Sequence, residues 1–583
     1  MQMNNKEIAS LLKNIAVYKE LSGDNPFKIR TFDQVSRIVE SYPEEIARIA
    51  REGTLTQIKG IGTGVSQVIT EYVEKGVSST LEQLESSFPK DILSLMSIPG
   101  MGPKKVKAVY EKLGISTVGE LEYACMENRL LTLEGFGEKS QEKILKGVAF
   151  KKQFQDLHLF SEAFTTAGEV RQELMNSGMF EKVTIAGSLR RGKTVFKDID
   201  ILCVPSKEHV PQTAQSVLSG LSDSDADFGV ISAGPTKVSI RRKGIQIDFR
   251  VVPESSFPSA LQHFTGSKEH NTLLRSRAKK MGLKMNEYGL FSGEQPLAVS
   301  SEQEIYQKLG LCMIPPELRE GTEEIEAAEK NEIPQLVERS DIKGMIHVHS
   351  TYSDGAHSIK TLAEECMKKG YSYLCISDHS RSAFYAHGLS SERIMEQIEE
   401  VRRLNEEIAP FRIFCGIESD ILGDGRLDYT EDVLGQLDFV IGSIHSNLSM
   451  TPESATTRLL HAIHNPHLTI LGHISGRLLL SREGYSYDEE KILSALEEER
   501  VVLEHNCNPH RLDPDWEFMK KASARGIMIS LGPDAHATEG FDDIEYGLVM
   551  AKKAWITGSG ILNCMTGDEI NEFFKERKTK KGI

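Results

Sequence analysis

The sequence predicts a multidomain protein with an all-α amino-terminal part, an α+β middle part and a carboxy-terminal α/β barrel. Short helical stretches separated by Gly-x-Gly turns occupy the first 150 residues. Strand-like runs that carry aspartates follow, and beyond residue 341 apolar runs repeatedly end in histidine or an acidic residue. At 583 residues and 39 % hydrophobic residues, the chain can bury several cores.

The net charge of −16 is divided unevenly along the chain. Residues 1–300 carry 39 Lys and Arg against 36 Asp and Glu, a net charge of +3, whereas residues 301–583 carry 30 against 49, a net charge of −19. The first half is compatible with contacts to a phosphate backbone, which need local cations. The second half suits either bound cations or a soluble surface, and charge alone does not separate the two.

The sequence also bears on where the protein resides. It has no apolar run of membrane-spanning length, and the start MQMNNKEIASLL lacks the basic and then apolar layout of a signal peptide. The eight cysteines are scattered, without a CxxC pair. We therefore expect a cytoplasmic protein with reduced cysteines and no membrane partner.

An apolar-Gly-x-Gly turn occurs three times in the first 150 residues, at 58–62, 98–102 and 133–137. Each copy precedes a helical stretch, whose first turn offers unpaired N–H groups to anions. One such turn is most often a plain helix connection, but the repetition favours contact with a DNA backbone. The turns resemble helix-hairpin-helix elements, for which we expect DNA contacts at Gly60, Gly62, Gly64, Gly100, Gly102 and Lys28.

Three aspartates lie on strand-like runs in the middle of the chain. Asp198 and Asp200 are two residues apart, so both side chains leave the same face of a strand, and Asp248 lies in the second run IQIDF. Three carboxylates on adjoining strands can hold two divalent ions, one activating a 3′-hydroxyl and one steadying a triphosphate. We expect all three to be catalytic ligands of two Mg²⁺ or Mn²⁺ ions.

The stretch GSLRRG, residues 187–192, precedes these aspartates. Its backbone N–H groups, hydroxyl group and guanidinium groups suit phosphates. A lone Asp-x-Asp is usually a solvated turn, but Gly-Ser followed by Asp-x-Asp and a later strand aspartate resembles the nucleotidyltransferase superfamily. The resemblance implies nucleotide contacts at Gly187, Ser188, Arg191 and Gly192.

The segment HFTGS, residues 263–267, narrows the resemblance to the family X DNA polymerases. These enzymes have a palm and a thumb and add deoxynucleotides to gapped or primer-template DNA. The resemblance implies deoxynucleoside triphosphates as substrates and nucleotide or template contacts at Phe264, Gly266, Asn271 and Arg275.

Three positions depart from the pattern of that family. His263 stands where many members have tyrosine, and Lys197 stands where a small residue is common. Some members use a lysine for Schiff-base lyase chemistry, but the corresponding position here is Val68, which has no amine. We therefore carry over DNA binding from the resemblance and leave out the lyase activity.

Histidines and acidic residues end successive apolar runs beyond residue 341. A lone histidine at a strand end is more often structural, but this pattern predicts an α/β barrel whose carboxy-terminal rim carries a metal site. Six imidazoles and three carboxylates suit two or three Mn²⁺, Zn²⁺ or Fe²⁺ ions and phosphoester hydrolysis by metal-bound hydroxide. The nine candidates are His347, His349, Asp354, His379, Glu418, His445, His473, Asp534 and His536.

This set resembles the PHP (polymerase and histidinol phosphatase) domain over essentially residues 341–583, with all nine of its metal positions filled and Arg477 as a candidate phosphate contact. The resemblance implies a TIM-like barrel with seven strands. A family X polymerase followed by a PHP domain is the bacterial arrangement. There the PHP domain is associated with 3′-to-5′ exonuclease activity, and sometimes with abasic-site or 3′-phosphate processing.

The predicted domains are an amino-terminal DNA-binding domain (1–90), a fingers-type helical domain (91–150), a palm (151–255), a thumb (256–315), a linker (316–340) and the PHP domain (341–583). We expect a monomeric DNA repair polymerase that fills short gaps and carries a 3′-to-5′ exonuclease. The alternatives are a PHP domain that hydrolyses a small phosphate ester, and a DNA-end scaffold with weak polymerase activity. The hairpins count against the first alternative and the complete ligand sets against the second.

Overall fold

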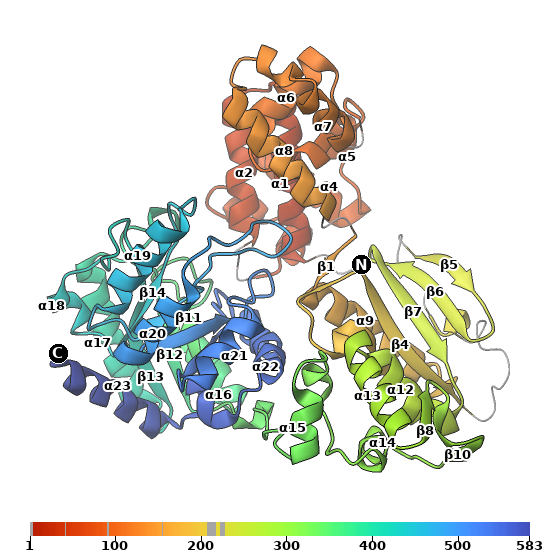
Figure 1. Cartoon of the computed structure of the whole chain (residues 1–583). Coiled ribbons are helices and arrows are strands. Elements are labelled where there is room, and N and C mark those ends of the chain that lie inside the picture. Colours follow the sequence, from red (N-terminus) through yellow and green to blue (C-terminus); the bar gives the residue numbers. More distant parts are fainter. Residues whose placement is uncertain are drawn as a thin grey trace. The chain divides into compact units, whose positions relative to one another are not determined.

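The computed structural model describes residues 4–40, 42, 44–89, 92–153, 156–206, 217–221 and 228–583. The chain forms two compact units, Met1–Gln155 and Asp156–Ile583 (Figure 1). The first unit is all-α, as the sequence predicts. Its helices are α1 (Asn5–Ser22), α2 (Pro26–Glu40), α3 (Ile46–Arg51), α4 (Thr63–Lys75), α5 (Ser79–Glu85), α6 (Pro103–Leu113), α7 (Val118–Met126) and α8 (Glu138–Gln153), with short 3-10 helices at Leu55–Gln57, Ile92–Ser97 and Arg129–Thr132.

Helix α1 is shared by two apolar cores of this unit. Its first turns bury Leu12 and Ile15 in a core with α2, α3 and α4. Its last turn buries Tyr18 and Leu21 in a second core with α6, α7 and α8. These four residues are spaced three apart in a helix of about 3.6 residues per turn, so the buried face rotates along α1 from the first core to the second.

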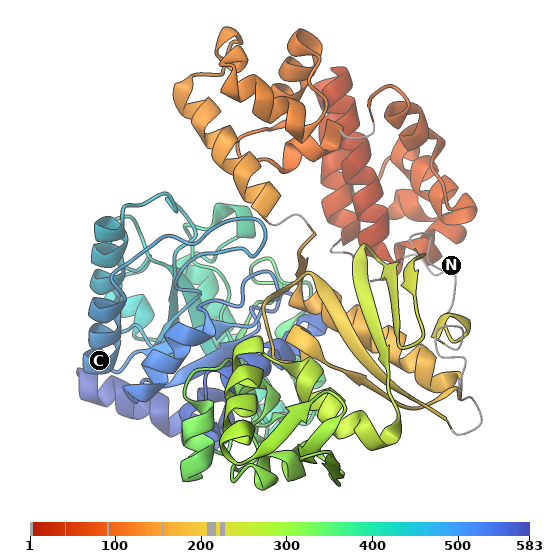
Figure 2. The same ribbon diagram turned by 45° about the vertical axis from the view of Figure 1, so that its right-hand side comes forward.

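The second unit begins with a five-stranded sheet of order β2-β4-β7-β6-β5, in which β4 and β7 are parallel and the other pairs antiparallel. Figure 2 shows this sheet with its helices. The elements are β1 (His158–Leu159), α9 (Phe160–Asn176), β2 (Phe180–Ile185), α10 (Gly187–Arg190), β3 (Val195–Phe196), β4 (Asp198–Pro205), β5 (Gly229–Ala233), β6 (Lys237–Arg242) and β7 (Ile245–Val251).

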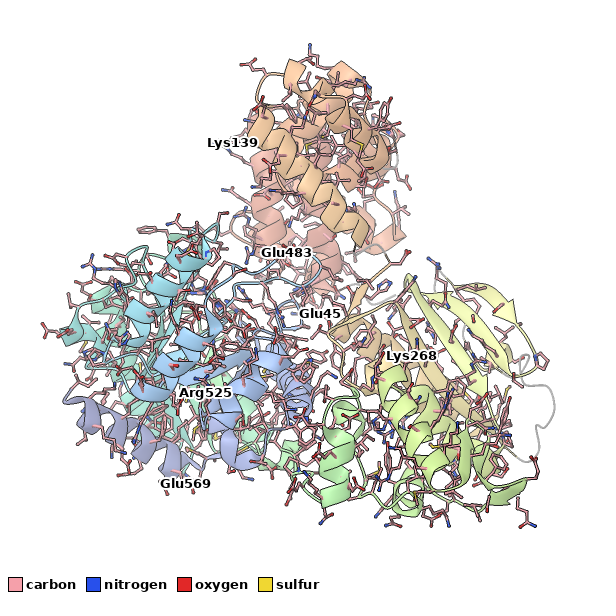
Figure 3. The ribbon with its side chains drawn as sticks, in the orientation of Figure 1. Glu45, Lys139, Lys268, Glu483, Arg525 and Glu569 are labelled. Carbon is pink, nitrogen blue, oxygen red and sulfur yellow. The ribbon has the colours of Figure 1, made fainter. Side chains whose placement is uncertain are left out.

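Two helices and a small antiparallel sheet follow. The elements are η4 (Glu254–Ser256), α12 (Phe257–Thr265), α13 (Lys268–Lys280), β8 (Leu283–Asn286), β9 (Gly289–Ser292), β10 (Gln295–Leu297), α14 (Glu302–Lys308), η5 (Pro316–Leu318), α15 (Glu324–Lys330) and η6 (Arg339–Asp341). Lys268 starts α13 at the surface (Figure 3). Part of the expected linker is buried, because Glu324 lies 2.7 Å from His270 Nδ1 and both side chains are fully covered.

Residues 344–532 supply a seven-stranded parallel sheet whose strands follow chain order. The strands are β11 (Gly344–Val348), β12 (Tyr373–Ile376), β13 (Arg412–Asp420), β14 (Phe439–Ser443), β15 (Ile470–Leu471), β16 (Val502–Asn506) and β17 (Ile529–Gly532). A parallel bridge between Val348 and Ala535 brings the first strand next to the segment after the last, so the sheet forms a nearly closed barrel. The prediction of a seven-stranded barrel is confirmed.

Helices connect the strands and cover the outside of the barrel. They are α16 (Ile359–Lys368), η7 (Phe384–Ala386), α17 (Ser391–Glu407), α18 (Glu431–Leu434), α19 (Pro452–Ile463), α20 (Glu489–Glu499), α21 (Trp516–Ala524), η8 (Thr538–Asp543), α22 (Ile544–Lys553), η9 (Gly558–Gly560), η10 (Leu562–Cys564) and α23 (Gly567–Lys581). Phe574 of α23 stacks on Phe439 with ring centroids 5.3 Å apart. This helix therefore covers one end of the barrel, with Glu569 at its surface (Figure 3).

Candidate active sites

The nine predicted metal ligands of the barrel lie together in the structure. Each follows or ends a barrel strand, and the carboxyl ends of parallel strands meet at one rim. Eight of the nine fall in three groups whose ligand atoms lie within 4.8 Å of one another. The groups are His349, Asp354, His379 and His536; His347, His349 and Asp534; and His379, Glu418 and His445. The ninth, His473, contacts Glu418 at 3.1 Å.

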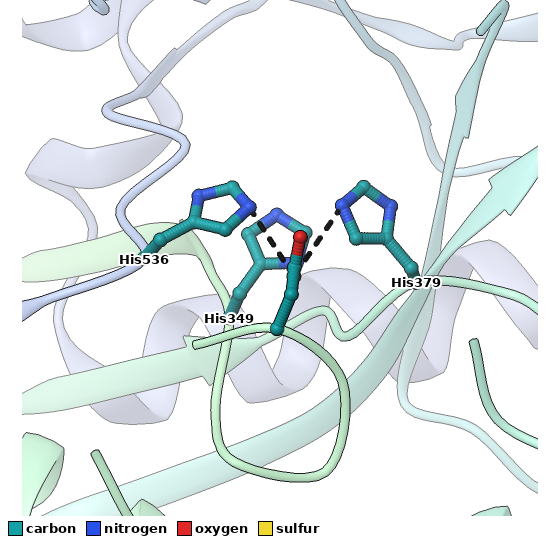
Figure 4. A group of neighbouring side chains, drawn as sticks. His349, His379 and His536 are labelled. Carbon is teal, nitrogen blue, oxygen red and sulfur yellow. Dashed lines mark ion pairs between the residues drawn. The ribbon is translucent and has the colours of Figure 1, made fainter. Parts of the chain in front are cut away.

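One group surrounds the carboxylate of Asp354. The Nε2 atoms of His536 and His379 lie 3.3 Å and 3.7 Å from Asp354 Oδ1. The ring of His349 lies between theirs, 4.2 Å and 4.4 Å from them by centroid, and Figure 4 shows the three imidazoles turned toward one another. Their nitrogens therefore converge on one small volume.

Glu418 lies at the centre of the cluster and is 1 % exposed. Its Oε1 atom is 3.3 Å from His445 Nε2 and 3.4 Å from His347 Nε2. Its Oε2 atom is 2.9 Å from His379 Nδ1. Burial alone would raise the pKa of Glu418, but the surrounding histidines hold that pKa well below its ordinary value. The carboxylate is therefore ionised and able to bind a cation.

Two carboxylates that the sequence reading missed orient these histidines. Glu504 of β16 contacts Nδ1 of His347, and Asp420 of β13 contacts Nδ1 of His445. A carboxylate on the outer nitrogen leaves Nε2 unprotonated toward the cluster, as metal-bound histidines require. Asp420 had a visible signal, because it lies two residues after Glu418, whereas Glu504 lies 157 residues from its partner.

The cluster fits divalent metal ions. His347 Nε2 and Glu418 Oε2 are buried and have close neighbours in the cluster, but among the described residues neither atom makes a hydrogen bond of suitable geometry. An unpaired buried polar atom is costly, and a divalent ion would satisfy both. The mixture of imidazole and carboxylate donors is typical of first-row transition metals.

Two arginines lie near this rim. Arg477, the predicted phosphate contact, donates from Nε to the carbonyl oxygen of Arg511 at 2.9 Å and also contacts the carbonyl of Leu512. Its guanidinium group therefore holds residues 511–512 in place. Arg511 Nε itself lies 3.9 Å from Asp534 Oδ2, which makes it a cation beside the cluster.

The three aspartates of the other predicted site lie on adjacent parallel strands. Asp200 of β4 pairs in register with Asp248 of β7, and Asp198 lies two residues earlier on the same face. Burial and these neighbours raise the pKa of Asp200 to about 6. Because divalent cations relieve such repulsion, the site fits them.

The aspartate side chains are nevertheless spread apart. Asp248 Oδ2 pairs with Lys237 Nζ at 2.6 Å, and its Oδ1 accepts a hydrogen bond from Gln246 at 3.1 Å. Among the described residues, groups of three or more His, Cys, Asp or Glu side chains whose ligand atoms lie within 4.8 Å of one another occur only at the barrel rim. The structure therefore brings the three aspartates to one sheet face without gathering them into one ligand group.

Gly187 is required by the geometry next to Asp200. Its φ is +64°, and a Cβ atom there would lie 2.2 Å from Asp200 Oδ2. The backbone N–H of Ala186 donates to the carbonyl of Asp200 at 2.8 Å. The glycine thus lets the loop pass directly beside the carboxylate, with Ser188 half-buried next to it.

The two arginines of this loop bind protein groups. Arg190 contacts Glu302 Oε2 at 2.6 Å, and its Nη1 donates to Thr265 Oγ1 at 2.7 Å. Arg191 is 8 % exposed, donates to the carbonyl of Thr265 and lies 3.5 Å from Glu320. Both side chains therefore tie the loop to the end of α12.

The residues around 263–275 form one network. His263 Nδ1 accepts a hydrogen bond from Arg275 at 2.9 Å, and Asn271 donates to the carbonyl of His263 at 2.8 Å. Burial and the charge of Arg275 lower the pKa of His263, so its ring is neutral at pH 7. The guanidinium of Arg250 lies 5.1 Å above the ring of Phe264.

At the end of α12, Gly266 has a φ of +71°. A Cβ atom there would lie 3.1 Å from Nη1 of Arg191. Gly266 therefore lets the 263–275 network lie directly against the GSLRRG loop, residues 187–192.

The three hairpins of the first unit share one backbone geometry. Their first glycines, Gly60, Gly100 and Gly135, have φ values of +102°, +93° and +84°. Gly62 and Gly102 are the N-caps of α4 and α6. A Cβ atom at either would meet nothing within 4 Å, and the same holds for Gly64.

Two side chains of this unit bear on the expected DNA chemistry. The side chain of Lys28 is 63 % exposed, with Asp24 4.0 Å away. Val68 is buried in α4, so this position offers neither an amine nor a surface contact.

Comparison with known proteins identifies the family. Profiles match for a helix-hairpin-helix domain (residues 3–78), a SAM-like helix-hairpin-helix tandem (92–149), the DNA polymerase beta thumb (260–320) and the PHP domain (346–508). The protein named DNA polymerase/3′-5′ exonuclease PolX from Bacillus subtilis (strain 168) is 38 % identical over 578 residues, which cover 98 % of this chain and 100 % of the relative. The chain belongs to the family X DNA polymerases with a PHP domain.

Two further relatives match parts of this family X polymerase. A probable phosphatase from Thermoanaerobacter sp. (strain X514) is 32 % identical over 249 residues, 40 % of this chain and 96 % of the relative. The human DNA-directed DNA/RNA polymerase mu is 26 % identical over 340 residues, 50 % of this chain and 64 % of the relative. The predictions of family, fold class and enzymatic character are confirmed. Among the described residues, we find no helix whose length and apolar character would let it span a membrane.

Proposed function

We propose that this family X polymerase fills short gaps in DNA by template-directed nucleotide addition and trims 3′ ends with its PHP barrel. The observation that carries the proposal is the convergence of nine ligand side chains at the rim of a barrel joined to a sheet that carries three aspartates. The substrates would be gapped or primer-template DNA and deoxynucleoside triphosphates. We further propose a cytoplasmic monomer.

The domains would divide this work. Residues 1–90 and 91–150 would hold the DNA backbone through Gly60, Gly62, Gly64, Gly100, Gly102 and Lys28. The open space beside Gly62 and Gly102 supports this, because a phosphate group could approach the helix N-termini there. Residues 151–255 would be the palm and 256–315 the thumb, joined through 316–340 to the PHP domain at 341–583.

In the palm, Asp198, Asp200 and Asp248 would hold two Mg²⁺ or Mn²⁺ ions. When bound, such ions activate the primer 3′-hydroxyl and neutralise the triphosphate. The 3′-hydroxyl gives up its proton to solvent, and its oxygen bonds to the α-phosphorus as the bond to pyrophosphate breaks. The triphosphate and base would contact Gly187, Ser188, Arg191, Gly192, Phe264, Gly266, Asn271 and Arg275.

At the barrel rim, the nine ligands would hold two or three Mn²⁺, Zn²⁺ or Fe²⁺ ions, which when bound supply a nucleophile at neutral pH and charge neutralisation. A water oxygen bonds to the phosphorus of the terminal nucleotide while the bond to the preceding 3′-oxygen breaks. That oxygen takes a proton, so the products are a shortened 3′-hydroxyl end and a nucleoside 5′-monophosphate. Arg511, held by Arg477, would bind the phosphate.

A labelled primer on gapped DNA with Mn²⁺ tests both activities. We expect extension with nucleotides and shortening without them. Asp200→Asn should abolish extension alone, because it removes a palm carboxylate. His349→Ala should abolish shortening alone, because it removes a ligand shared by two of the rim groups.

Matched variants control for nonspecific effects. Glu254→Gln on the palm surface and His464→Ala on the barrel surface change similar side chains that are exposed and far from the ligand sets, so both activities should persist. Retained extension by His349→Ala also shows that this variant is folded. If shortening survives the loss of both His349 and His473, the nuclease assignment is ruled out. If extension survives Asp198→Ala and Asp248→Ala, the polymerase assignment is ruled out.

A small phosphate monoester is a second candidate substrate for the PHP barrel. The match of its residues to a probable phosphatase favours this candidate. Comparing kcat/KM for p-nitrophenyl phosphate and a single-stranded oligonucleotide separates the two. The nuclease proposal requires the oligonucleotide to be preferred.

A further inference from the structure

Two neighbouring aromatic side chains project from the protein beside the rim cluster. Phe384 is 87 % exposed, the highest value among the large hydrophobic side chains that the structure describes, and Tyr385 is 69 % exposed. Both belong to the short helix η7, which follows the ligand His379. Single exposed apolar residues are ordinary, but two adjacent aromatics beside a reactive site are typical of a binding surface.

The loop that carries them is built to hold them outward. Its ends are joined by a hydrogen bond from Leu389 N–H to the carbonyl of His379 at 2.9 Å. Ala383 and Ala386, which flank the two aromatics, are fully buried. A Cβ atom at Gly388 would lie 1.8 Å from the carbonyl oxygen of Ser380, so the loop closes tightly at its base.

The same loop is tied to the cluster. Ser382 Oγ donates to Asp420 Oδ2 at 2.6 Å, and the other oxygen of Asp420 contacts His445. The ring of Tyr385 lies 6.2 Å from the ring of His379 by centroid. The aromatic pair is therefore fixed relative to the ligands that surround the reacting phosphate.

We propose that Phe384 and Tyr385 form a stacking platform for the bases at a single-stranded 3′ end of DNA. Every base has an aromatic face, so such a platform binds without regard to sequence. In a duplex those faces are covered by neighbouring pairs, so the platform favours frayed or unpaired ends. Arg511, on the same rim, adds a cation for the phosphate. The inference rests on the proposed exonuclease and names its substrate form.

Exonuclease kinetics on two matched oligonucleotides test the platform. One is an ordinary 5′-labelled single strand, and the other has abasic residues at its last two positions. The double variant Phe384→Ala with Tyr385→Ala should lower kcat/KM on the ordinary strand about 10-fold or more, chiefly through KM. It should leave the abasic-ended strand unchanged. Phe384→Trp and Tyr385→Phe keep a stacking face and should retain wild-type values.

Tyr288→Ala is the matched control, because Tyr288 is 67 % exposed in the turn between β8 and β9. It should change neither substrate. If the double alanine variant lost kcat/KM equally on both strands, the loop would have a structural role instead. If kcat/KM fell on neither strand, the platform proposal would be wrong. A protein ligand on this surface would also give no difference between the two strands.

A binding readout separates this inference from the nuclease assignment. An oligonucleotide with 2-aminopurine at its 3′ end loses fluorescence when that base stacks. We expect quenching by the wild-type chain in EDTA, where no hydrolysis occurs, and none by the double alanine variant. If wild-type protein with Mn²⁺ shortened neither strand, the proposed exonuclease would fail while quenching still reported the platform. Absence of quenching by wild-type protein would overturn the platform itself.

Discussion

At residue scale, a backbone position controls the placement of Asp200 in the proposed palm. Gly187 combines a φ of +64° with direct contact to Asp200, so two separate costs meet any side chain there. The left-handed conformation costs about 1–2 kcal/mol for a residue with a Cβ atom. The close approach adds a clash that only displacement of Asp200 can relieve.

Gly187→Ala is therefore expected to reduce extension by about 100-fold or more, since a 1 Å misplacement of a reacting group is already worth about that factor. Gly178→Ala is the matched control. Gly178 has a similar φ of +69°, but a Cβ atom there meets nothing within 4 Å. Thermal unfolding should show a loss of stability in both variants, and a larger one in Gly187→Ala because of the added clash. Primer extension should be lost only in Gly187→Ala. Equal extension by the two would contradict the role given to the Asp200 contact.

Glu504 is a test of how the rim histidines are oriented. Glu504→Gln keeps the shape of the side chain but removes the charge that faces Nδ1 of His347. We expect the affinity for Mn²⁺ to fall about 10- to 100-fold, as for other carboxylates behind metal-bound histidines. Metal titration followed by elemental analysis measures this, with exposed Glu497→Gln as the control. Unchanged affinity would mean that Glu504 only fills space.

At element scale, the hairpin glycines play two roles. The first glycine of each hairpin needs its positive φ, whereas the second caps the following helix in a conformation that alanine can adopt. Open space beside the second glycine means that a methyl group there would meet no protein atom. It would instead meet whatever approaches the helix N-terminus.

The combined change Gly62→Ala and Gly102→Ala should therefore weaken binding to gapped DNA several-fold, with a change in unfolding free energy of only about 1 kcal/mol. Fluorescence anisotropy at fixed ionic strength measures the binding. Gly119→Ala, in α7, adds a methyl group that likewise meets no atom within 4 Å and should leave binding intact. If the double variant bound gapped DNA as tightly as Gly119→Ala, these two hairpins would not contact the DNA.

The sequence predicted the barrel and its nine ligands because both signals are local. Each apolar run marks a strand, and each candidate ligand lies near the end of such a run or in the loop after it. Glu504 was not predictable in the same way, because a carboxylate inside an apolar strand does not reveal a partner 157 residues away. Arg477 has the guanidinium group that a phosphate contact needs, but this group donates to the carbonyl oxygens of Arg511 and Leu512, which belong to another loop.

At the scale of the whole second unit, one lysine links the barrel to the loop that precedes β4 in the five-stranded sheet. Lys553, the last residue of α22, is 3 % exposed, contacts Glu320 and donates to the carbonyl of Arg191 at 3.1 Å. Earlier in α22, Tyr546 packs edge-on against Phe160 of α9, with centroids 5.5 Å apart. The GSLRRG loop, residues 187–192, thus rests partly on the barrel.

Lys553→Met should disturb that loop while sparing the rim. It removes a buried cation and leaves Glu320 with Arg191 as its remaining cationic contact, so we expect a smaller loss than the about 3–5 kcal/mol typical of a broken buried pair. We expect a higher KM for nucleotides in primer extension and unchanged shortening of DNA without nucleotides. Lys552→Met is the neighbouring control, because Lys552 pairs instead with Glu338. A parallel fall in both activities would point to general unfolding.

The position of α22 matters for any relative that keeps only the polymerase activity or only the PHP activity. A polymerase half severed near residue 340 would lose Lys553 and would expose the face of Gly192 against which Val549 now packs. A change of gene architecture that separates the halves would therefore leave Glu320 with Arg191 but without Lys553. The PHP barrel would in this way persist as a scaffold for nucleotide addition even after losing its own metal ligands.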